Sequence, residues 1–141
     1  MAECSAVIDN LVKGHGILLS TINQMQTCLR SYSAIKPQLQ EFEGQVFGHL
    51  GQQNKELFEQ LSEYFREDRQ KLKMIEFLTV NLKDIKIKAL TLFDQFPAAD
   101  KADRYPGLFP KQFTDFTQEL MARIKLEGEY LLPLLEQYNL P

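Results

Sequence analysis

Two charged residues near the C-terminus interrupt an otherwise apolar stripe, and they are the first sign of chemistry in this sequence. Arg123 and Glu127 lie one helical turn apart, where a plain helix would place leucine or isoleucine facing a core. Burying an unpaired charge costs several kcal/mol, so the two residues either line a polar site or satisfy each other. The stripe consists of Phe113, Phe116, Leu120, Arg123, Glu127, Tyr130 and Leu134.

Three other segments also place polar residues on apolar stripes of helical spacing. With the pair above, the full set is His15, His49, Gln53, Asn81, Arg123 and Glu127. Each lies near the middle of its segment, so in an antiparallel bundle the six should converge on one pocket. Imidazoles and a carboxylate are iron or zinc ligands, whereas a guanidinium has no lone pair to offer and would repel a cation. The alternative is internal hydrogen bonding, with the two charged residues as a buried ion pair.

The helices that must position these residues are predicted near 4–32, 38–66, 70–96 and 110–138. Lys36 and Pro37 should end the first segment, because the residue before a proline disfavours the helical conformation. The break near residues 66–71 contains neither glycine nor proline, so one long helix across it is the alternative.

A loop over residues 97–110 carries three of the six prolines and precedes the last helix. Within that helix, Pro133 predicts a kink or an early end near Tyr130. No segment shows the alternation typical of a strand. We therefore predict an all-α fold in which residues 1–141 form one domain, an up-down-up-down antiparallel four-helix bundle.

Composition narrows the function classes. The 141 residues carry a formal net charge of -3, which predicts no nucleic-acid partner and no membrane-surface partner. Cys4 and Cys28 would lie too far apart on one helix for a disulfide, and residues 1–10 lack the pattern of a signal peptide, so we expect a cytoplasmic protein with reduced thiols. No Ser-His-Asp set or glycine-rich phosphate loop is present, so we expect no enzyme.

The sequence resembles the hemerythrin-like (HHE cation-binding) domains over nearly its whole length. The similar segments are residues 11–18 around His15, 49–58 beginning with His49, 80–85 around Asn81, and 123–135 with its apolar-proline end. The resemblance implies a four-helix bundle and places His15, His49 and Glu127 at metal-ligand positions of the family. It also places Gln53 where the family has glutamate, and Asn81 and Arg123 where it has histidine.

Three hypotheses about function follow. The first is a non-enzymatic binding or regulatory protein without a cofactor, whose di-iron site is largely lost. Its partner would be an unknown protein or a small anion. The chain would be a monomer or a homodimer. The second is a hemerythrin-like metalloprotein, an oxygen or redox sensor or carrier that holds iron through His15, His49 and Glu127. The third is a protein-binding bundle, because the second and fourth helices are also similar to anti-sigma factors of the regulator-of-sigma-D type.

Overall fold

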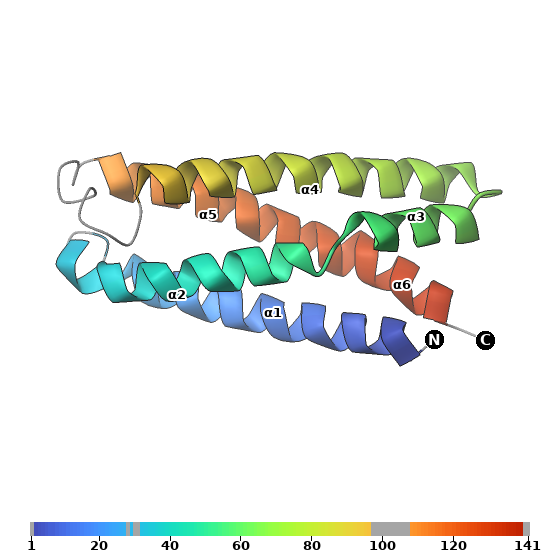
Figure 1. Ribbon diagram of the computed structural model, residues 1–141, viewed down its shortest axis with the longest axis horizontal. Helices are drawn as coiled ribbons and strands as arrows, with labels where there is room; N and C mark the ends of the chain where they lie inside the picture. The colour runs from blue at the N-terminus through green and yellow to red at the C-terminus, as the bar shows by residue number, and fades with distance from the viewer. Residues whose placement is uncertain (1, 28, 30–31, 97–107, 140–141) are drawn as a thin grey trace.

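The computed structural model describes residues 2–27, 29, 32–96 and 108–139, and every regular element among them is helical. The elements are α1 (Ala2–Gln26), α2 (Tyr32–Gly51), α3 (Lys55–Tyr64), α4 (Arg69–Gln95), α5 (Leu108–Leu126), the π-helix η2 (Glu127–Leu131) and α6 (Leu132–Asn139). Figure 1 shows four long helical columns side by side: α1, α2 with α3, α4, and α5 with η2 and α6. The predicted all-α bundle is confirmed for these residues.

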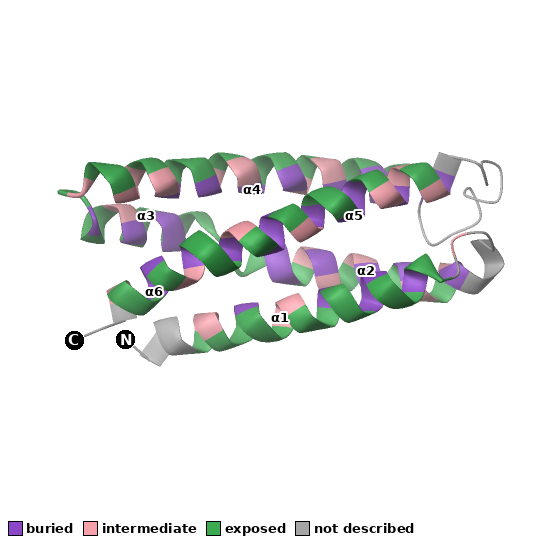
Figure 2. Ribbon diagram, turned by 180° about the vertical axis from the view of Figure 1, so that it is seen from behind, coloured by how far each residue is buried: buried purple, intermediate pink, exposed green. Residues whose placement is uncertain are grey.

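The core follows the predicted stripes, and Figure 2 shows the buried residues facing inward between the columns. Phenylalanines fill the part of the core between α2, α4 and α5: Phe42 packs edge to face against Phe93, Phe113 and Phe116. Such aromatic pairs contribute about 0.5–1.5 kcal/mol each beyond the burial of their area. No described helix is both long and apolar enough to cross a bilayer.

The predicted helix over 38–66 is wrong, because the chain breaks after Gly51. Tight backbone bonds from Gln52 and Gln53 close α2, and the side chain of Asn54 accepts a hydrogen bond from the amide of Leu57 to cap α3. The break changes the face that points inward. Before it the buried residues are Ile35, Leu39, Phe42, Val46, His49, Leu50 and Gln53, and after it Leu57, Phe58, Leu61 and Phe65.

One further boundary differs from the prediction, and another is confirmed. Helix α2 already begins at Tyr32, with Pro37 inside it. Pro37 lies in the second turn of α2, where its missing N–H removes the backbone hydrogen bond that the carbonyl of Ser33 would otherwise accept. A real break does precede α4, where the side chain of Asp68 caps the helix by accepting from the amide of Lys71. The alternative of one long helix across 66–71 is therefore wrong.

The fourth column continues past the position where a kink or an end was predicted. A wide π-turn, η2, joins α5 to α6, and the amide of Leu132 bonds the carbonyl of Glu127. Such a turn accommodates Pro133, which has no N–H to give to the preceding turn. It also changes the inward position: Leu131 is buried, whereas Tyr130, expected to face the core, is 38% exposed. Of the loop predicted over 97–110, residues 97–107 lie outside the described residues, as does Cys28, and residues 108–110 belong to α5 instead of the loop.

Candidate functional site

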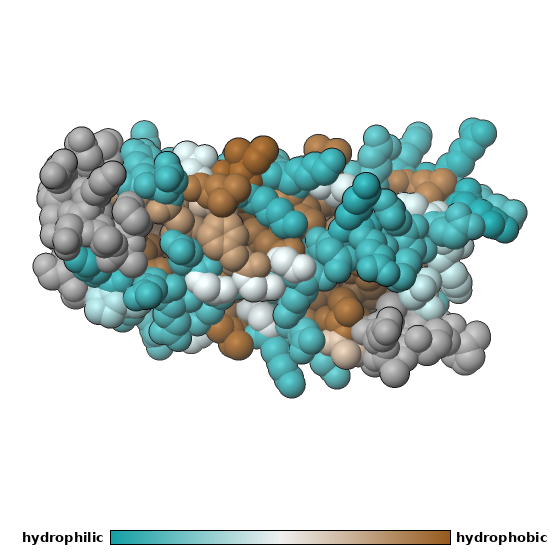
Figure 3. Space-filling model, viewed as in Figure 1, coloured by the Kyte–Doolittle hydropathy of each residue, from teal (hydrophilic) through white to brown (hydrophobic). Residues whose placement is uncertain are grey.

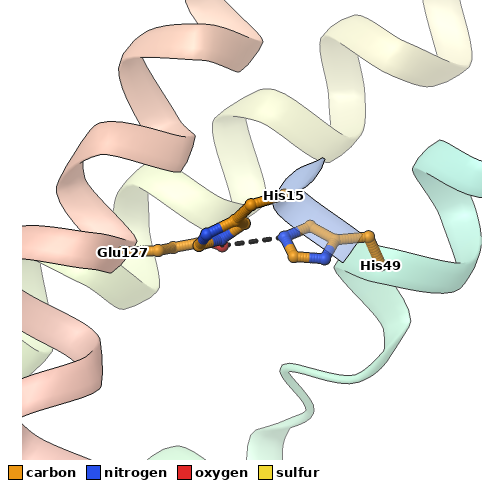
Figure 4. Close-up of side chains that lie close together, drawn as sticks. All are labelled: His15, His49 and Glu127. Atoms are coloured by element: carbon orange, nitrogen blue, oxygen red, sulfur yellow. Dashed lines mark hydrogen bonds and ion pairs between the residues drawn. The ribbon is translucent and has the colours of Figure 1, made fainter. Parts of the chain in front are cut away.

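The six polar residues singled out from the stripes lie together in the structure, arranged around the carboxylate of Glu127. Its Oε1 accepts hydrogen bonds from the Nε2 atoms of His15 and His49, over 2.7 and 2.8 Å. Its Oε2 accepts from Nε2 of Gln53 and from Nε of Arg123, each over 2.8 Å. Figure 4 shows the imidazoles of α1 and α2 beside the carboxylate of the fourth column. Both oxygens of this fully buried carboxylate are therefore engaged.

Arg123 completes the cluster from the other side, and its side chain is only 1% exposed. Besides its bond to Glu127, the guanidinium donates through Nη1 to the backbone carbonyl of Leu78 over 2.7 Å and to Oδ1 of Asn81 over 3.1 Å. Its Nη2 donates to Oε1 of Gln53. Gln53 thus joins the two charges, because its amide gives to the carboxylate and accepts from the guanidinium. All four helical columns contribute to one connected network.

Local backbone features place the residues of the network. Arg123 and Glu127 lie one turn apart, so a single helix face aligns both charges. The turn after Gly51 directs Gln53 inward just before Asn54 starts the next helix. Gly14 lets α1 approach α2 closely, since a Cβ atom at this position would lie 2.5 Å from Nδ1 of His49. The glycine is therefore required by the packing of the site.

The network keeps both charges in place. Burial alone would raise the pKa of Glu127, but hydrogen bonds from His15 and His49 and the charge of Arg123 outweigh it and hold the pKa well below its usual range. Burial lowers the pKa of Arg123, and Glu127 opposes that change. A guanidinium nevertheless stays protonated in proteins. The interior therefore contains an ion pair surrounded by amides and imidazoles.

The donor set does not fit a di-iron centre. An ionised carboxylate only accepts hydrogen bonds, so Nε2 of both His15 and His49 carries a hydrogen and has no lone pair free for a metal. The buried Nδ1 of His49 has no partner among the described residues, whereas a metal-bound histidine usually gives its second N–H to an acceptor. Arg123 occupies the second oxygen of Glu127 and cannot act as a ligand.

One subset of the network does have the spacing of a cation site. Ligand atoms of His15, His49 and Glu127 all lie within 4.8 Å of one another. These three are the residues for which the sequence predicted remnant ligand positions. A single cation there would have to displace the two hydrogen-bonded protons on Nε2, and Arg123 would remain as a neighbouring positive charge.

A cleft of about 560 Å³ lies against the network between α3 and α4. Gln53 lines its inner side, and Phe58 and Leu82 supply apolar surface. Its charged residues are Lys55, Lys83, Lys86, Glu59 and Glu63. Both signs of charge are thus present, and the amide of Gln53 is already used on both atoms by the ion pair.

No family model matches this chain, and no curated protein or solved structure is significantly similar to it. The site is therefore interpreted from its own geometry. Sequence reasoning found all six side chains but missed the carbonyl of Leu78, because a backbone acceptor leaves no mark on residue type. The sequence also shows that Gly14 precedes His15, but the close approach of Gly14 to His49 depends on the pairing of α1 with α2.

Proposed function

We propose that this chain is a non-enzymatic binding or regulatory protein, built on a hemerythrin-like bundle in which an internal ion pair replaces the metal centre. The observation that carries the proposal is the position of Arg123. Its guanidinium makes four hydrogen bonds inside the bundle, to Glu127, Gln53, Asn81 and the carbonyl of Leu78. A fixed positive charge thus lies where the resemblance expects a histidine bound to iron, and polar groups of three columns satisfy it.

The hemerythrin-like part of the proposal includes the up-down-up-down order of the four columns. Short connections support it, because α2 follows α1 within a few residues and α4 follows α3 after only four. The start of α1 and the end of α6 also lie at the same end of the bundle in Figure 1, as an even number of antiparallel passes requires.

Metal analysis of protein purified without an affinity tag tests this proposal. We expect less than one iron per chain after aerobic purification, and no absorption bands of an oxygen-bridged di-iron centre. Arg123→His alone, and together with Gln53→Glu and Asn81→His, should raise iron affinity over that of the parent, because these changes remove the fixed cation and add ligand atoms. Two irons bound per parent chain would refute the proposal.

The second candidate is a protein that holds one metal ion, and the clustering of His15, His49 and Glu127 favours it. A titration of the parent with Fe²⁺ or Zn²⁺, repeated on His15→Ala, separates the two candidates. Stoichiometric binding by the parent that the substitution abolishes would establish the metal site. Equal, weak binding by both proteins supports the non-metal proposal.

The binding role belongs to the outer surface in this proposal, because the two buried charges, Arg123 and Glu127, already have partners. A small anion would be held in the cleft between α3 and α4 by Lys55, Lys83 and Lys86. If the chain acts instead as an anti-sigma-like protein-binding bundle, its partner would need exposed apolar side chains, which α1 provides at Val12, a residue that is 52% exposed.

A further inference from the structure

The outer face of α4 carries apolar side chains that no described residue covers. Phe77, Val80, Ile87 and Leu90 are each more than half exposed. Their spacing of three and seven residues places them on one side of the helix, opposite the buried stripe that contains Leu78 and Ile85. Figure 3 shows brown apolar groups along the edge of the molecule formed by α4, with charged groups between them. We call these four residues and the charged ones among them the α4 outer face.

The apolar residues of this face are arranged symmetrically about the midpoint of the face. Phe77 and Leu90 lie at equal distances from the midpoint between residues 83 and 84, and so do Val80 and Ile87. A second copy of α4 laid antiparallel about that midpoint would therefore bring large apolar side chains opposite one another in every apolar layer. A surface that complements itself under a two-fold rotation is what a symmetric dimer requires.

Two pairs of charged residues obey the same symmetry with opposite signs, whereas the exposed Glu76 is matched by Thr91. Lys83 and Asp84 flank the midpoint, so each would face the other residue of the second copy. Lys73 and Asp94 are also equidistant from it, near the two ends of the helix. All four are exposed. Asp84 already contacts Lys88 of its own chain at 3.0 Å, whereas no ion pair joins Lys73, Lys83 or Asp94 to another residue in the part of the chain that the structure describes.

We propose that a second copy of this chain packs antiparallel against the α4 outer face, forming a two-fold symmetric dimer. Apolar layers of Phe77 with Leu90 and of Val80 with Ile87 flank a centre of two equivalent pairs between Lys83 and Asp84. An unrelated protein partner would not require this mirror-like arrangement of both apolar and charged positions. A contact along one helix is small, so the dimer dissociates in the micromolar range.

Charge reversal at the centre tests the dimer without touching the core. Lys83→Asp places acidic residues opposite one another in both central pairs, and Asp84→Lys does the same with basic residues. At low ionic strength each variant should raise the dimer dissociation constant about tenfold or more in sedimentation equilibrium. The double variant Lys83→Asp with Asp84→Lys restores opposite charges and should recover parental association.

Mixing the two single variants is the most discriminating experiment, because in a heterodimer of the two every central pair has opposite charges. The mixture should form heterodimers more readily than either variant forms homodimers. Lys125→Asp, on an exposed position of α5, is the matched control and should leave association unchanged. Circular dichroism of each variant verifies that it is folded.

Two results would overturn the proposal. One is a parent protein that remains monomeric at about 0.1 mM, well above the dissociation constant that a small interface supports. The other is a dimer that both reversals leave intact, which would place the interface on a different face.

Discussion

Removing the carboxylate of Glu127 is the perturbation that most directly tests the buried ion pair. Glu127→Leu leaves Arg123 charged and without its main partner in an interior where both side chains are at most 1% exposed. It also leaves the Nε2 donors of His15 and His49 and the amide of Gln53 without an acceptor. The loss therefore involves four donors, one of them ionised.

Breaking a buried ion pair by removing one partner costs about 3–5 kcal/mol. The lost hydrogen bonds are part of the same network, so their costs do not simply add to this figure. We expect Glu127→Leu to lie in that range, which is a large share of the roughly 5–15 kcal/mol that stabilises an ordinary domain. The exposed neighbour Glu129→Leu is the control, with an expected change within about 0.5 kcal/mol.

The assay is urea denaturation followed by circular dichroism for the parent, Glu127→Leu, Arg123→Met and the double variant. The double variant removes both charges, so it should be less destabilised than the sum of the single variants by about 0.5–3 kcal/mol. Additive effects in this cycle would mean that the two side chains do not stabilise each other. A Glu127→Leu protein as stable as the parent would refute the buried-pair reasoning altogether.

Two further predictions concern the same site. The pKa of Glu127 is lowered in the folded protein, so its contribution to stability is complete above the usual carboxyl pKa of about 4.3 and is lost as the pH falls through the lower folded value. The thermal unfolding temperature should therefore fall more steeply on acidification for the parent than for Glu127→Leu. Equal slopes of unfolding temperature against pH would contradict this. Gly14→Ala should destabilise the protein because its Cβ would meet Nδ1 of His49, whereas Gly16→Ala, which meets nothing within 4 Å, should stabilise α1 by up to about 1 kcal/mol. Denaturation midpoints of the two alanine variants test the second prediction, and a stabilising Gly14→Ala would contradict it.

The polar positions could be found from sequence because each one violates a strong pattern. A histidine, an amide or a charge on an apolar stripe is visible without knowledge of the neighbouring helices. In a bundle, a position in the middle of each helix is enough to predict that such residues lie near one another. The prediction that His15, His49 and Glu127 hold a metal remains untested by the geometry. Their mutual distances allow it, but the hydrogens on both Nε2 atoms oppose it.

The errors in the predicted fold arose where local backbone chemistry competes with periodicity. His49 and Gln53 continue one stripe up to the turn, and Glu56 continues it in sequence but is exposed in α3. Asn54 could have signalled the new helix, since asparagine is a favoured N-cap. Pro133 signalled an irregularity near Tyr130 but not that it would be a π-turn. The wider turn moves Leu131 into the inward place that the stripe gives to Tyr130.

The burial of the polar cluster limits where a ligand could bind to this protein. His15 is the most exposed of the two histidines and the ion pair, with 13% of its side chain accessible, while His49, Arg123 and Glu127 are almost completely buried. A ligand or metal ion entering the cluster would have to replace several hydrogen bonds at once. Each buried donor that loses its acceptor would stay unpaired until it found a new one. Binding to the outer face of α4 or to the cleft beside α3 requires no such rearrangement. In the proposed function, binding therefore takes place on the surface and not at the ion pair.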